Sequence, residues 1–188
     1  MKSLQYLCMA AVLLFSAAAL KVEAATVAII PLINKVEFNT VEEERVPNLI
    51  FINEAVNILK KKPGYTLSEN ARVRHAIEDN VDPYKLPTRE QLAAICKKGN
   101  VDIVFAMELT DYDYDMLDMG RTDSRTMKMR VKANMVTYNR LTGEYVKKPC
   151  VDDSEIDEVF SSRWDPVQEC WTRLVRQEFD RVTKVRSR

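Results

Sequence analysis

The amino-acid sequence predicts an α/β fold: a mixed β-sheet with an antiparallel C-terminal hairpin, packed by helices. Residues 101–109 form a nearly unbroken apolar run, which is typical of a strand covered on both faces. Apolar residues recur at helical spacing over 46–59 and again over 167–182. Residues 127–135 alternate between apolar and polar, which is typical of a strand with one solvated face. A buried central strand with a half-exposed hairpin beside it accounts for all three patterns.

Residues 1–24 have the features of a secretory signal peptide. Lys2 supplies a positive charge, Leu7 to Leu20 an apolar run, and Val22-Glu23-Ala24 resembles a small-residue cleavage site. The run is shorter than the roughly 20 residues that a spanning helix needs, and no later stretch is a better candidate. Cys8 lies too early in the run for a lipid anchor. We therefore expect an exported mature chain, periplasmic or otherwise extracytoplasmic, with one α/β domain over 25–188 and no transmembrane segment.

Charge and composition restrict the function classes. The chain of 188 residues has 28 basic and 28 acidic residues, and removal of Lys2, Lys21 and Glu23 with the leader changes the net charge from 0 to −1. Such a balance offers no net attraction to nucleic acid or to an anionic membrane, so a nucleic-acid partner is not expected. Because the chain has only four Gly and is 46% hydrophobic, it has the composition of a folded protein.

The first half of the mature chain reads as alternating strands and helices. A second central strand opens it at Thr26 and ends near Pro31, which cannot donate a ladder hydrogen bond, and 34–44 is expected to be an exposed polar loop. The spacing predicts a helix over 46–62, closed by three lysines that complement the helix dipole. A short strand over 65–67 follows.

Two shorter helices precede the central strand. Ser68 with Glu69 starts the first, and Asp79 to Pro87 is a surface loop. The second spans 88–98, with Thr88 as N-cap in a capping box and Gly99 as C-cap. The first also carries the lone histidine, His75, which has no His or Cys at ligand spacing and is interpreted as a structural or surface residue.

The second half reads as a meander and a final helix. After the central strand, Asp and Tyr alternate over 111–115, so the strand there leaves the core or becomes solvated. A turn is predicted over 119–124, followed by a hairpin over 126–151 that turns at 140–143. The acidic stretch 152–158 is expected to be a solvated loop, and the last helix starts at Pro166 and ends in the basic tail 184–188.

Three cysteines remain after cleavage, and an odd number leaves at least one thiol without an intramolecular partner. Cys96 lies in an apolar helical register and is expected to be a small buried hydrophobe. Cys150 and Cys170 are the candidate disulfide pair. The alternative is that Cys170 belongs to the core, because it shares a helical face with Leu174.

Three short motifs resemble the TolB amino-terminal-like proteins, a group that includes CsgG-like curli-secretion proteins and lipoprotein activators of penicillin-binding proteins. The motifs are the opening strand 27–34, the helix, turn and strand over 92–104, and the hairpin turn 138–146. Asn139 replaces the usual acidic residue of that turn, and the chain has neither a lipobox nor the membrane-inserting hairpins of a secretion pore. The resemblance implies a non-catalytic envelope module that binds other macromolecules.

Two function classes follow. The first is an interaction module whose partner is an envelope protein or a cell-wall component, with contact surfaces in the loop 35–45 and in the segment Asp111, Tyr112, Asp113 and Tyr114. Ordinary cross-strand packing is the alternative role of these tyrosines. The second is a carboxylate- or metal-dependent hydrolase that uses Asp111 with Asp113, or Asp152 with Asp153. No calcium-loop spacing supports it, so the sequence predicts no catalytic residue, no metal and no cofactor.

Overall fold

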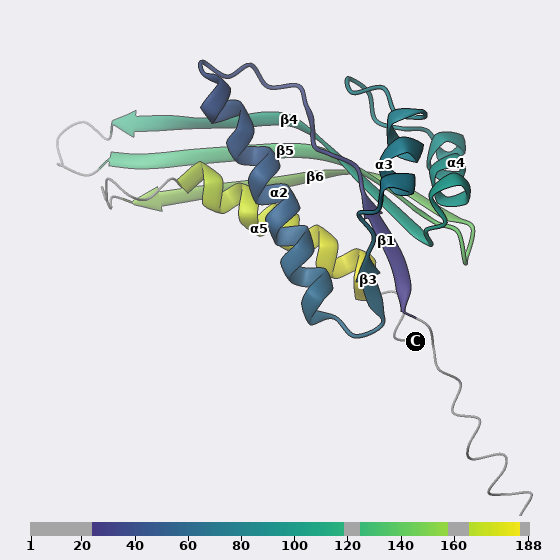
Figure 1. Ribbon diagram of the computed structural model, residues 1–188. Coiled ribbons are helices and arrows are strands. Elements are labelled where there is room, and N and C mark those ends of the chain that lie inside the picture. The colour runs from purple at the N-terminus through teal and green to yellow at the C-terminus, as the bar shows by residue number, and fades with distance from the viewer. Residues whose placement is uncertain (1–23, 119–124, 158–165, 185–188) are drawn as a thin grey trace, which may run out of the picture.

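The computed structural model describes residues 24–118, 125–157 and 166–184 of the chain (Figure 1). A mixed sheet is covered on one face by two long helices, α2 (Val41–Lys61) and α5 (Pro166–Lys184). Two shorter helices, α3 (Ala71–Glu78) and α4 (Arg89–Gly99), pack on the other face at one end only (Figure 1). The predicted fold class, a mixed α/β sheet with an antiparallel hairpin, is confirmed.

The sheet is parallel on one side of its central strand and antiparallel on the other. Its strand order is β3-β1-β4-β5-β6, and β2 also pairs with β4. Strands β1, β2 and β3 run parallel to their partners, whereas β4, β5 and β6 form an antiparallel meander. The strands are β1 (Ala25–Ile29), β2 (Ile33–Asn34), β3 (Tyr65–Leu67), β4 (Ile103–Asp118), β5 (Arg125–Asn139) and β6 (Glu144–Asp157).

The main core lies between the sheet and the two long helices. Phe105 of β4 packs against Phe179 of α5 with tilted rings and centroids 4.1 Å apart, and the ring of Phe51 of α2 lies within 6.0 Å of both. Trp171 is fully buried, and its indole N–H donates to the carbonyl of Pro47 at 2.8 Å. These contacts fasten the last helix to the first long one. No helix among the described residues is long and apolar enough to cross a bilayer.

Helix α2 starts five residues before the predicted position. Thr40 is its N-cap and accepts a hydrogen bond from the backbone N–H of Glu43. Three glutamates occupy the first turn, where their negative charges interact favourably with the positive end of the helix dipole. The predicted loop 34–44 is therefore wrong beyond residue 40. Residues 33–34 are also a short strand, β2, beside β4.

Helix α4 confirms its predicted start and corrects its predicted end. The capping box of Thr88 with Gln91 is present. The C-cap is Asn100, with φ of 54° in the left-handed region, and not Gly99, which is the last helical residue. A Cβ on Gly99 would lie 3.3 Å from a methyl group of Val73, so glycine suits the close approach of α3 and α4 there.

Two strands of the meander are longer than predicted. Strand β4 continues through the Asp/Tyr segment to Asp118, and β6 continues to Asp157, so the predicted solvated loop is wrong over 152–157. Beyond residue 109, β4 pairs only with β5, which pairs in turn with β6. We call this part of the meander the three-stranded end. The turn predicted at 119–124, the leader and the residues after 184 lie outside the described residues.

Candidate interaction surface

No helix among the described residues covers the outer face of the three-stranded end. Met129 and Val131 of β5 point to the other face, where they join the core cluster under α2 and α5. The intervening Lys128 and Arg130 are exposed, and α3 and α4 cover the sheet only at its opposite end (Figure 1). The described residues of this open face are Asp111, Asp113, Lys128, Arg130, Lys132, Val151, Asp153 and Glu155.

Charges on the open face are arranged in rows across the strands. In the central strand Arg130 lies opposite Asp113 of β4 and Asp153 of β6, and its Nε is 3.1 Å from a carboxylate oxygen of Asp153. One row further, Lys132 Nζ is 2.9 Å from a carboxylate oxygen of Asp111. The basic residues along β5 are thus flanked by acidic residues of β4 and β6. A hollow of about 350 Å³ runs along these rows.

A β-bulge aims the two aspartates at this face. The register of β4 against β5 shifts between Leu109 and Asp111. Residues two apart on a regular strand share a face, so without the shift Asp111 would point into the core with Leu109, which is fully buried. With the shift, Asp111 pairs with Lys132 and the next residue, Tyr112, turns to the core instead.

The four predicted contact residues therefore do not form one surface. Asp111 and Asp113 lie on the open face. Tyr112 packs on the opposite face against the core cluster, and its ring meets Phe38 edge-on with centroids 5.6 Å apart. Tyr112 therefore has a packing role, against the core cluster and the ring of Phe38, which lies between β2 and α2. The side chain of Tyr114 lies outside the described residues.

The two acidic residues proposed as a pair on β6 point in opposite directions. Asp153 lies on the open face, whereas Asp152 faces α5 and receives two hydrogen bonds from Arg173, at 2.6 and 3.0 Å. The hydrogen bond to Asp152 raises the pKa of Arg173. Because consecutive residues of a strand lie on opposite faces, these carboxylates cannot act on one substrate atom.

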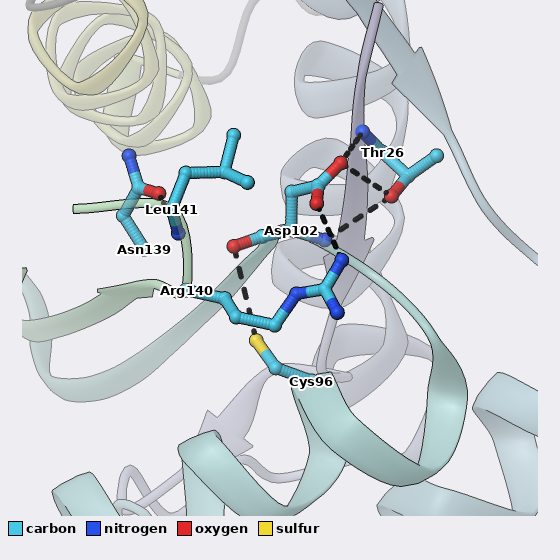
Figure 2. Close-up of polar contacts among 6 residues, drawn as sticks. All are labelled: Thr26, Cys96, Asp102, Asn139, Arg140 and Leu141. Atoms are coloured by element: carbon cyan, nitrogen blue, oxygen red, sulfur yellow. Dashed lines mark hydrogen bonds and ion pairs between the residues drawn. The ribbon is translucent and has the colours of Figure 1, made fainter. Parts of the chain in front are cut away.

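A second polar cluster lies at the covered end of the sheet (Figure 2). One carboxylate oxygen of Asp102 accepts hydrogen bonds from the backbone N–H and the hydroxyl of Thr26, both at 2.9 Å, and the other is 2.8 Å from a guanidinium nitrogen of Arg140. Burial alone would raise the pKa of Asp102, but the hydrogen bonds from Arg140 and Thr26 lower it below its ordinary value. This cluster joins β1, the start of β4 and the β5–β6 turn.

Among the described residues, the cysteines are Cys96, Cys150 and Cys170, and all three are buried and unbridged in the structure. Cys96 is fully buried, as predicted, and its thiol donates a long hydrogen bond of 3.9 Å to the backbone carbonyl of Asp102 (Figure 2). Burial raises the pKa of Cys96 and of Cys150 to about 12. Cys150 and Cys170 both belong to the main core cluster, and a bridge between them stays a prediction.

Two further ionisable residues, His75 and Glu178, have acidic or basic partners and differ in burial. His75 is a surface residue, as interpreted from the sequence, with its Nδ1 3.3 Å from a carboxylate oxygen of Glu78. Glu178 of α5 is only 2% exposed and contacts Lys148 of β6 and Arg181, the latter at 2.7 Å. No sequence signal set Glu178 apart from other helix glutamates.

Within 24–118, 125–157 and 166–184, no group of three or more His, Cys, Asp or Glu side chains is arranged to hold a metal ion.

Comparison with protein-family models and with curated proteins finds no match. Among solved structures, the chain is similar to the hypothetical protein CT253 from Chlamydia trachomatis, with 13% identity over 84% of this chain and 95% of that one and a TM-score of 0.49. Lipoprotein GNA1162 from Neisseria meningitidis gives 13% identity, 85% and 99% coverage and a TM-score of 0.46. The C-terminal domain of Escherichia coli LpoB is 14% identical over 76% of this chain and 89% of that one, with a TM-score of 0.36. Similarities this distant carry no functional argument, so function is argued from the chain itself.

Proposed function

We propose that this chain is an exported, non-catalytic interaction module that binds an envelope protein or a cell-wall component through the open face. The observation that supports the proposal is the one-sided covering of the three-stranded end. Its inner face is packed under α2 and α5, whereas its outer face presents ordered side chains to solvent. The resemblance of the sequence to TolB amino-terminal-like proteins agrees with an envelope role.

The charges of the open face favour a partner with cations and hydrogen-bond donors. Among the described residues, this face has four carboxylates and three cations, and the cations lie in the middle strand. Pairs such as Arg130 with Asp153, each about 60% exposed, contribute little to folding because solvent screens them. Their carboxylates keep further lone pairs, so a partner can bind them at little cost to the fold.

Binding of solubilised envelope extract to the immobilised mature chain tests the proposal. We expect specific partners to be retained by the wild type and lost by the double variant Asp111→Lys/Asp113→Lys, which reverses two charges of the open face. The matched control is Glu69→Lys/Glu78→Lys, which reverses two exposed charges at α3. Equal retention by the open-face variant and the wild type, or equal loss from both variants, would contradict the proposal.

A further inference from the structure

Strand β6 forms one edge of the sheet (Figure 1). Among the described residues it pairs only with β5, and no other element bonds to the backbone on its outer side. Its pairing with β5 runs without a register shift from Glu144 to Asp157. A long unpaired edge can accept a further strand, and proteins normally carry features that prevent this.

The hydrogen bonds of β5 show which backbone groups of β6 point to the free edge. The carbonyl of Lys132 accepts a hydrogen bond of 3.1 Å from the hydroxyl of Thr110 in β4. Just after β5, the backbone N–H of Arg140 donates to the carbonyl of Asp102 at 2.7 Å, also on the side of β4. Even-numbered residues of β5 therefore point their N–H and C=O groups toward β4. Their partners in β6 are odd-numbered and point theirs away from β5.

The two halves of this edge differ in how well they are protected. Pro149 is one of the outward-pointing residues, so it costs no bond to β5 and leaves the edge without a donor there. Lys147 is exposed, and a lysine on an edge strand also opposes pairing. Beyond them, Val151, Asp153 and Glu155 are exposed and point their backbone groups outward, with neither proline nor lysine among them.

The charges beside this second half favour a positive side chain on an added strand. One row across the sheet consists of Asp113, Arg130 and Asp153, so its charges alternate and the next position suits a cation. In another row, Glu155 is 3.8 Å from Lys128. Both cations lie on β5, so the carboxylates of β6 are the charges nearest to an added strand. A second copy of β6 would place carboxylates opposite carboxylates, which disfavours self-pairing.

The second half of β6 is also held in place from its other face. Arg173 of α5 donates hydrogen bonds of 2.6 and 3.0 Å to the carboxylate of Asp152 and one to the hydroxyl of Ser154. A strand that is ordered in the free protein loses less conformational entropy when a partner binds.

We propose that an extended segment of a partner protein, with basic residues at every second position, adds as a strand to β6 along 151–155. Backbone hydrogen bonds to the odd-numbered residues supply affinity, and cations opposite Asp153 and Glu155 fix the register. The inference rests on the proposed function, because these two carboxylates belong to the open face. It adds the mode of binding and makes the partner a protein.

Hydrogen exchange of the wild-type mature chain tests the edge geometry. The odd-numbered amides over 151–155 should exchange at least about ten-fold faster than those of Asp152 and Ser154, which point to β5. Equal protection of the two sets would overturn the proposal.

Titration of the wild type with three capped hexapeptides tests strand addition. One alternates lysine with threonine, the second alternates lysine with proline and has the same charge, and the third alternates glutamate with threonine. The lysine–threonine peptide should protect the odd-numbered amides over 151–155 and bind with a Kd on the order of 1 mM. The others should bind at least about five-fold more weakly, since proline removes donors and glutamate reverses the charge. No saturable binding, or equal binding of the two lysine peptides, would refute strand addition.

Proline variants separate the edge from the charges. Val151→Pro removes one outward donor and keeps every charge, so it should bind the lysine–threonine peptide about five-fold more weakly. Lys147→Pro, on the protected half of the same edge, is the matched control and should bind it as the wild type does. Wild-type affinity in Val151→Pro, or equal weakening in both variants, would refute the assignment. The exchange and peptide measurements on the wild type decide the proposal even if Val151→Pro unfolds.

The envelope-extract assay separates failure of this inference from failure of the proposed function. Val151→Pro should lose the partners that the wild type retains. If Val151→Pro retains them and Asp111→Lys/Asp113→Lys loses them, the open face binds but strand addition is refuted. If both variants retain them, the proposed function fails as well.

Discussion

Replacing Asp102 tests whether the polar cluster at the covered end of the sheet holds three elements together. The change Asp102→Ala removes the acceptor of two hydrogen bonds from Thr26 and of the contact with Arg140, which the structure places at 2.8 to 2.9 Å (Figure 2). The backbone N–H of Thr26 then has no side-chain acceptor.

The expected loss follows from these three contacts. Each bond from Thr26 contributes about 1 kcal/mol net. The pair with Arg140 contributes less than about 1 kcal/mol, because the arginine side chain is 42% exposed and solvent screens the charges. The sum is about 2 to 3 kcal/mol, which corresponds to a decrease in melting temperature of about 5 to 10 °C for a domain of this size.

The loss of unfolding free energy in Asp102→Ala should depend on pH. The pKa of Asp102 is lower in the folded state than in the unfolded chain, so the carboxylate stabilises the fold above the unfolded value, about 3.9, and this contribution disappears as the pH falls through the folded value. The difference in unfolding free energy between the wild type and Asp102→Ala is therefore expected to be largest at pH 7 and to narrow below about pH 4.

Urea denaturation between pH 7 and pH 2.5 measures this difference. The matched control is Asp79→Ala, since Asp79 pairs with Lys98 at 3.6 Å and both side chains are more than half exposed. It should change stability by less than about 0.5 kcal/mol at every pH. The assigned role would be refuted if Asp102→Ala lowered the unfolding free energy by less than about 0.5 kcal/mol. It would also be refuted if the difference from the wild type were larger but did not become smaller in acid.

Three further predictions concern the leader, the open face and the thiols. Intact-mass analysis should find a mature chain that begins near Ala25 without a lipid adduct, and acylation or a retained Met1 would contradict this. Asp111→Ala/Asp113→Ala should change the unfolding free energy by less than about 1 kcal/mol, because the pair with Lys132 is part-exposed; a larger loss by urea denaturation would assign these carboxylates a structural role. If Cys150 and Cys170 are bridged, alkylation of the unfolded, unreduced protein should label Cys96 alone, whereas three labelled thiols would exclude the bridge.

Patterns that depend on near neighbours predicted the structure well. The capping box at Thr88 and the alternation along β5 involve residues within a few positions of each other, and the structure has both. The start of α2 was missed because its apolar spacing begins at Val46, whereas the helix begins at the cap residue Thr40 and the glutamates after it. Reading the caps before the apolar spacing would have placed this end correctly.

Features that depend on distant partners could not be predicted in this way. The bulge between Leu109 and Asp111 is a property of the pairing of β4 with β5, and it decides that Tyr112 faces the core. Nothing within the Asp/Tyr segment marks the shift. An alternating segment predicts two faces, but the strand beside it decides which face is buried.

The acidic end of β6 shows why isolated charge runs are misleading. As a local pattern, 152–158 has few apolar residues and reads as a solvated loop. In the sheet, Asp153 faces Arg130 across a strand pair, and Asp152 is bound by Arg173 of α5, which lies 21 positions further along the chain. Opposite charges across a ladder favour pairing, so these residues belong to a strand because of cations elsewhere in the chain. The same exposed pairs add little stability, and their carboxylates therefore remain available to a partner that brings its own cations.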